Sequence, residues 1–135
     1  MVRMCLNCKI VLSGRDQLKY CSNKCQGTSR YIKSVRDWKE GIKNGGVGIK
    51  TRIVSTFLRR YLFEKYDSRC SDCGWHKVHP ITGKIPLEID HIDGNAENNI
   101  EKNLRILCPN CHSLTPHFRN LNRGNGRKWR SNQNF

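Results

Sequence analysis

Apolar residues recur at helical spacing in two stretches of the chain. In the first stretch, Tyr31, Val35 and Trp38 are separated by four and three positions, which places them on one face of a helix. The spacing predicts an amphipathic helix from Ser29 to Glu40 that ends at Gly41, because glycine is a poor helix former. The opposite face is basic and carries Arg30, Lys33, Arg36 and Lys39.

The second stretch predicts a helix from about Thr51 to Tyr66. Its apolar stripe, which we expect to pack in the core, consists of Ile53, Val54, Phe57, Leu58, Tyr61 and Leu62. Basic residues lie largely off this stripe, at Arg52, Arg59, Arg60 and Lys65. Between the two helices, the glycine-rich segment 44–50 is predicted to be a linker.

Beyond residue 84 the apolar segments are shorter than in the two predicted helices. Residues 85–92 alternate enough for a strand, although Pro86 favours an edge position or a later start. A turn and a polar loop over 93–102 precede a returning strand at 104–107. A short helix is predicted between Pro109 and Pro116, since proline is tolerated in the first turn of a helix and breaks its interior. The predicted order is strand, loop, strand, helix.

The net charge is +14, from 25 Lys and Arg against 11 Asp and Glu. Residues 1–69 carry 16 basic and 5 acidic side chains, residues 70–118 carry 4 and 6, and residues 119–135 carry 5 and none. Such an excess favours a polyanionic partner, with nucleic acid ahead of an anionic membrane. For the basic residues of the second predicted helix, contact with phosphate and ordinary solvation both remain open.

The chain has no apolar run of the roughly 18 residues that a transmembrane helix needs, and no signal-peptide pattern at its N-terminus. We therefore expect a cytoplasmic protein that is not secreted. In a reducing cytoplasm, the eight cysteines are better explained by metal binding than by structural disulfides.

The cysteines form four closely spaced pairs that predict two zinc sites. The first set is Cys5, Cys8, Cys21 and Cys25, and the second is Cys70, Cys73, Cys108 and Cys111. Four thiolates complete a tetrahedral zinc ion and leave no position for water, so both sites are expected to be structural. Redox motifs or free thiols would not predict four pairs, and His76 and His79 are weaker alternative ligands. The first set predicts a zinc ribbon or treble-clef-like module that needs its metal to fold.

Four further side chains in the second half of the chain carry candidate chemistry. Asp90 and His91 are adjacent on the first predicted strand, Asn103 precedes the second, and His112 follows the last cysteine. A carboxylate, an amide and two imidazoles can hold one divalent ion and one base beside a phosphodiester, which indicates a nuclease site. The acidic residues nearby do not have the spacing of an EF-hand calcium loop.

At these residues the chain resembles the HNH endonucleases of the ββα-metal superfamily, and above all small phage and mobile-element members with an N-terminal zinc finger. The likeness covers residues 70–118 well, and segments 20–25 and 38–41 are similar with less specificity. The expected fold class is α+β: a small zinc-stabilised protein with an N-terminal zinc ribbon or treble-clef-like finger, helices, and a C-terminal ββα-metal HNH core. The expected division is a finger with its basic helix (1–43), a linker (44–50), a nuclease domain (51–118) and a basic tail (119–135).

By position, the resemblance implies that His91 is the general base, that Asp90 and His112 bind one divalent ion, and that Asn103 is a catalytic residue that orients the base or helps to bind the ion. The other ring nitrogen of His91 would be held by a main-chain carbonyl or by Asn103. Many relatives have lysine and some have a further histidine at positions where this chain has Thr115 and Pro116. Water and phosphate oxygens would then complete the metal sphere, and the lost phosphate contact would pass to Arg105, His117 or Arg119.

The resemblance implies a metal-dependent DNA endonuclease that hydrolyses phosphodiester bonds in duplex DNA and leaves 5′-phosphate and 3′-hydroxyl ends. Mg²⁺ or Mn²⁺ is favoured at its catalytic site, and Ni²⁺ or Zn²⁺ is also compatible with the donor set. The alternative is a noncatalytic zinc-finger DNA-binding protein with a decayed nuclease core. RNA cleavage would use the same chemistry, but the sequence has no RNA-binding signature.

The expected partner is DNA, not a membrane, with phage packaging or replication proteins as further candidates. The protein is expected to be a monomer, and to act in the cytoplasm of the host bacterium if a phage encodes it. The residues expected to bind nucleic acid are Arg52, Arg59, Arg60, Arg105, Arg119, Arg123, Arg127, Lys128 and Arg130.

Overall fold

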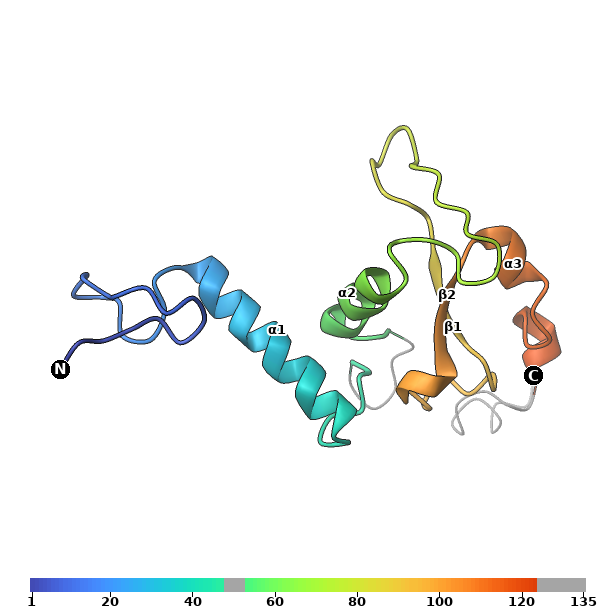
Figure 1. Ribbon diagram of the computed structural model, residues 1–135. Helices are drawn as coiled ribbons and strands as arrows, with labels where there is room; N and C mark the ends of the chain where they lie inside the picture. Colours follow the sequence, from blue (N-terminus) through green and yellow to red (C-terminus); the bar gives the residue numbers. More distant parts are fainter. Residues whose placement is uncertain (48–52, 124–135) are drawn as a thin grey trace. The chain divides into compact units, whose positions relative to one another are not determined.

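The computed structural model describes residues 1–47 and 53–123, and it divides into two compact units, Met1–Lys43 and Asn44–Phe135 (Figure 1). Over these described ranges it is a small α+β protein with few helices and one two-stranded sheet. The finer division into finger, linker, nuclease domain and tail stays a prediction. None of the helices in the described part of the chain is long and apolar enough to cross a membrane.

The first unit consists of cysteine-bearing loops followed by helix α1 (Asn23–Lys39). Within these loops, an isolated antiparallel bridge pairs Met4 with Val11. The helix begins six residues before the predicted start, because Ser22 caps it by accepting a hydrogen bond from the backbone N–H of Cys25 at 3.2 Å. Its end agrees with the prediction, since Gly41 follows with a φ of 79°.

In the second unit, helix α2 (Thr56–Lys65) is shorter than predicted at its N-terminal end. Residues 51 and 52 lie outside the described residues. Ile53 and Val54 are extended rather than helical, because the Ile53 carbonyl accepts from the Val47 N–H at 2.9 Å and Val54 bridges Gly46. Ile53 is accordingly 65% exposed and does not belong to the core stripe.

The sheet pairs β1 (Glu88–His91) with β2 (Leu104–Leu107) in an antiparallel register that places Asp90 opposite Arg105. The first strand starts at residue 88, three positions after the predicted start and two after Pro86. A short 3-10 helix, η1 (Glu101–Asn103), leads from the loop into the second strand.

Helix α3 (Pro109–Ser113) follows β2 and contacts both strands, with proline in its first turn as predicted (Figure 1). The core of the unit lies between the sheet and α2. Its fully buried side chains are Leu58, Leu62, Leu87, Leu104, Ile106 and Leu107. Burial of each such side chain is worth about 1.5–3 kcal/mol, so this small cluster is a modest core for the unit.

The last described element, the 3-10 helix η2 (Arg119–Asn122), packs against the turn that follows β1. Gly94 in this turn has a φ of 74°, and a Cβ there would lie 2.5 Å from Oδ1 of Asn122. The Asn122 side chain donates to the Gly94 carbonyl at 2.8 Å. Glycine is therefore required at this position both for its backbone conformation and for the close approach of η2.

Candidate active site and zinc clusters

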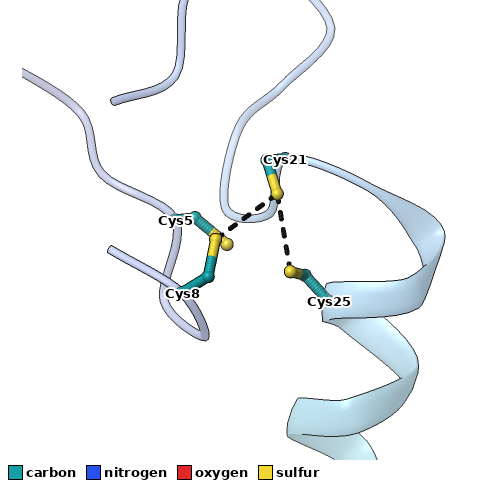
Figure 2. A group of neighbouring side chains, drawn as sticks. All are labelled: Cys5, Cys8, Cys21 and Cys25. Carbon is teal, nitrogen blue, oxygen red and sulfur yellow. Dashed lines mark hydrogen bonds between the residues drawn. The ribbon is translucent and has the colours of Figure 1, made fainter. Parts of the chain in front are cut away.

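The cysteines of the first unit converge as the sequence predicts. Figure 2 shows Cys5, Cys8 and Cys21 on loops and Cys25 in the first turn of α1, with their side chains turned toward one another. The sulfur of Cys21 lies 3.5 Å from that of Cys8 and 3.4 Å from that of Cys25. Sulfurs bound at about 2.3 Å to a tetrahedral zinc ion lie about 3.8 Å apart, so this group fits a zinc ion.

The second set converges in the other unit, where the sulfurs of Cys73 and Cys108 are 3.8 Å apart. In each set the four sulfurs all lie within 4.8 Å of one another. The second set joins the loop at 70–73 to the end of β2 and to α3, which carries Cys111. Both four-cysteine clusters could therefore hold zinc, and they tie together elements with little core of their own.

Hydrogen bonding within the clusters divides the thiols into two kinds. The Cys8 backbone lowers the pKa of Cys5 to about 6, whereas the side-chain hydrogen bond with Cys25 raises the pKa of Cys21 to about 12. One sulfur thus favours the thiolate while its neighbour keeps a proton. Zinc displaces such protons when it binds, because only thiolates are its ligands.

The two histidines considered as alternative zinc ligands lie outside both clusters. Nδ1 of His79 accepts from the backbone N–H groups of Ile81 and Thr82, each at 3.2 Å, and so holds a turn in the loop before β1. His76 contacts the guanidinium of Arg69 at 3.0 Å. Both histidines therefore have structural contacts of their own.

The structure brings Asp90 of β1 and His112 of α3 together. Oδ1 of Asp90 lies 3.9 Å from Nε2 of His112, and their side chains are 8% and 26% exposed. Two ligands bound to one ion at about 2.1 Å each lie at most about 4.2 Å apart, so this spacing permits a shared divalent ion. The carboxylate and imidazole form a mixed oxygen and nitrogen donor set.

Glu88 belongs to this site although its role was missed in the sequence. Its Oε2 contacts Nδ1 of His112. Glu88 and Asp90 are two residues apart on a strand and so face the same side, toward α3. A carboxylate on one imidazole nitrogen fixes the ring and directs the other nitrogen toward a metal. The i, i+2 spacing on the predicted strand was the available signal.

Replacing Glu88 with glutamine is expected to weaken divalent-ion binding at Asp90 and His112 by about 10–100-fold, because the neutral amide loses the charged contact with the His112 ring. Titration calorimetry with Mn²⁺ on zinc-loaded protein would measure the change. Glu64→Gln, an equivalent substitution on the exposed side of α2, serves as the control. Equal affinities for the two variants would contradict an orienting role for Glu88.

Arg105 occupies the position opposite Asp90 in the register. Its Nε donates to Oδ2 of Asp90 at 2.7 Å, and its Nη1 lies 3.5 Å from Oδ1 of Asp72. The guanidinium thus neutralises one Asp90 oxygen and leaves the other facing His112. A phosphate contact by Arg105 stays a prediction.

Thr115, at the position where the resemblance implies a lysine in many relatives, lies just after α3. Thr115 is buried, and its hydroxyl donates to the carbonyl of His112 at 2.9 Å. The ring of Phe118 packs edge-on against His112, with centroids 5.4 Å apart. Thr115 therefore closes the end of the helix beside His112.

Asn103 organises the loop between the two strands. Its Oδ1 accepts from the backbone N–H of Asp93 at 2.9 Å, and its Nδ2 donates at 2.8 Å to Oδ1 of Asp93 and to the carbonyl of Asn98. Burial raises the pKa of Asp93, but hydrogen bonds from Asn98, the Asn95 backbone and Asn103 outweigh it and lower the pKa overall. The hydrogen bonds of Asn103 therefore hold the loop that follows His91.

The ring of His91 is held by a different asparagine. Nε2 of His91 lies 2.7 Å from Oδ1 of Asn99, within the same loop. The expected partners, a main-chain carbonyl or Asn103, were both wrong, because η1 directs the Asn103 side chain to the Asp93 turn instead. A polar loop with several asparagines gives no sequence signal for which one reaches the ring.

The basic residues expected to bind nucleic acid are described only in part. Arg59 donates to the Leu87 carbonyl at 3.3 Å, Arg60 pairs with Glu64 at 2.8 Å, and Arg119 stacks over the Phe118 ring. Arg123 is exposed. The remaining candidates lie outside the described residues: Arg52, Arg127, Lys128 and Arg130. Their contact with nucleic acid stays a prediction.

Comparison with known proteins adds an independent finding. Over 68 residues the chain is 46% identical to the H-N-H endonuclease F-TflIV of Escherichia phage T5. The resemblance to phage HNH endonucleases is confirmed. The enzyme class predicted from the sequence is therefore the same as the class of this relative, HNH endonuclease. The match covers 50% of this chain and 26% of the relative, so the matched segment spans about a quarter of the relative's length. No family model and no solved structure matches the chain.

Proposed function

We propose that the protein is a metal-dependent HNH DNA endonuclease that cleaves phosphodiester bonds in duplex DNA. The observation that carries the proposal is the facing pair of Asp90 and His112, 3.9 Å apart. Asp90 lies on β1, the strand that also carries His91, and His112 lies on α3. Under this proposal β1, β2 and α3 form a ββα-metal core. The 46% identity to a phage H-N-H endonuclease supports the same assignment.

In the proposed mechanism, Asp90 and His112 would hold one divalent ion, which we expect to be Mg²⁺ or Mn²⁺. Such an ion, when bound, supplies a Lewis acid and a template for phosphate oxygens. Arg105 pairs with one Asp90 oxygen and leaves the other toward His112, and Glu88 would fix the His112 ring. With Nε2 engaged by Asn99, His91 offers Nδ1 as the base that takes a proton from the attacking water.

The products would be 5′-phosphate and 3′-hydroxyl ends. The two four-cysteine clusters would hold structural zinc, since their donor sets leave no place for a reacting water. The charge of +14 supports DNA as the partner, because lysine and arginine release counterions from the phosphate backbone. Action in a reducing bacterial cytoplasm would keep all eight thiols available for zinc.

Incubation of zinc-loaded protein with supercoiled plasmid is expected to yield nicked or linear DNA when Mg²⁺ or Mn²⁺ is added, and intact plasmid when neither is added. End-labelling would then show the 5′-phosphate. If the folded protein binds DNA but cleaves neither this plasmid nor a pool of phage and bacterial DNA, the noncatalytic DNA-binding alternative is favoured.

A further inference from the structure

Two asparagine side chains form a hydrogen-bonded chain that ends on His91. Nδ2 of Asn44 donates to the carbonyl of Glu97 at 3.3 Å, and Nδ2 of Asn99 donates to Oδ1 of Asn44 at 2.9 Å. Oδ1 of Asn99 then meets Nε2 of His91 at 2.7 Å. The chain thus runs from a main-chain carbonyl through two amides to the imidazole.

The direction of every bond in this chain follows from its starting point. The Glu97 carbonyl can only accept, so Asn44 must present its NH₂ group there and its oxygen to Asn99. Asn99 must in turn present its NH₂ group to Asn44 and its oxygen to the ring. An oxygen that only accepts requires a proton on Nε2 of His91, which leaves the lone pair on Nδ1.

We propose that Asn99 and Asn44 are positioning residues that hold the His91 ring in its orientation and in the Nε2–H tautomer. This inference rests on the proposed role of His91 as the base, because a ring protonated on Nε2 takes the proton of the attacking water at Nδ1. Asn44 precedes the predicted nuclease domain, yet it supports the residue that holds the base.

The surroundings of the amide pair are built to keep it in place. Asn99 is 4% exposed, and a Cβ on Gly46 would lie 3.3 Å from Oδ1 of Asn44 and 3.4 Å from Nδ2 of Asn99. Glycine therefore allows the backbone to close over both amides. The segment is anchored by the bridge between Gly46 and Val54 and by the Ser55 N–H, which donates to the Gly45 carbonyl at 2.8 Å.

The direct test is nitrogen-15 NMR of the full zinc-loaded chain with labelled histidine, at a pH where the rings are neutral. The His91 signals, assigned by their loss in His91→Gln, are expected to show the Nε2–H tautomer. In Asn99→Ala the two tautomers should mix. Asn99→Asp loses the donor to Asn44 but should retain Nε2–H, because both oxygens of its carboxylate can only accept a hydrogen bond from the ring. Asn44→Ala alters an exposed side chain, so its fold should survive, and it should shift the tautomer population in the same direction.

Cleavage kinetics supply the second measurement. Asn99→Ala is expected to lower kcat at least tenfold with KM for DNA changed less than twofold, and the exposed Asn120→Ala serves as the matched control. A pure Nε2–H signal in both folded alanine variants would overturn the inference. If His91→Ala itself still cleaves DNA, the role of His91 as base fails, and the tautomer measurement still decides separately whether the amides hold the ring.

Discussion

Replacing His91 with alanine is expected to lower the rate of plasmid cleavage by about 10²–10⁴-fold, the usual contribution of a general base. The fold should survive, because His91 lies at the end of β1 and outside the fully buried core. Affinity for DNA should also persist, since the phosphate backbone is attracted mainly by lysine and arginine. Time courses with supercoiled plasmid at saturating Mg²⁺ or Mn²⁺ would give the rate, and filter binding in the absence of a divalent ion would give the affinity.

His76→Ala is the matched control for this substitution, because His76 is an exposed histidine of the same unit that contacts Arg69. It should cleave at the unaltered rate. A His91→Ala protein that cleaves as fast as the control would remove His91 as the base.

Loss of one ligand from the second four-cysteine cluster is expected to unfold the second unit. Cys73→Ser changes a single exposed sulfur, yet zinc binding in small zinc domains is worth about 10–16 kcal/mol, comparable with the whole stability of a domain at about 5–15 kcal/mol. Bound zinc should fall from two ions to one per chain, and amide exchange in β1 and β2 should lose its protection.

Cys8→Ser is the matched substitution in the first cluster. It should also leave one zinc ion, but amide protection in β1 and β2 should persist, because the two units are separately compact. If Cys73→Ser keeps two zinc ions and full protection in both strands, the cluster is not what holds this unit together.

The elements that could be predicted are those with a local signal. The cysteine pairs predicted both clusters, and alternating apolar residues with Pro109 predicted the order of β1, β2 and α3. The start of α1 could not be found from apolar spacing, because its first turn contains Cys25 and is fixed by the Ser22 cap. Periodicity reports the buried face of a helix and is silent about a turn that faces a metal cluster.

The missed contacts arise from tertiary packing. Ile53 fits the helical stripe, but the pairing of 53–55 with 45–47 takes it into an extended segment. Glu88 acquires its role only when α3 places His112 against β1. Asn99 differs from the neighbouring asparagines only in its position once the loop is closed. The sequence could therefore point to Asp90, His91 and His112. The contacts of Glu88 and Asn99 with the two histidine rings become visible only in the folded chain.

The short helix α3 has a practical consequence for chelator experiments. Cys111 and His112 are consecutive residues on its five-residue span, so one belongs to the second four-cysteine cluster and the next faces Asp90. A chelator strong enough to strip the thiolate cluster would displace His112 as well. Inactivation by EDTA would then look the same whether the protein had lost the divalent ion at Asp90 and His112 or the zinc ion of the second four-cysteine cluster. Restoring activity with Mn²⁺ alone, while counting the zinc still bound, would separate the two.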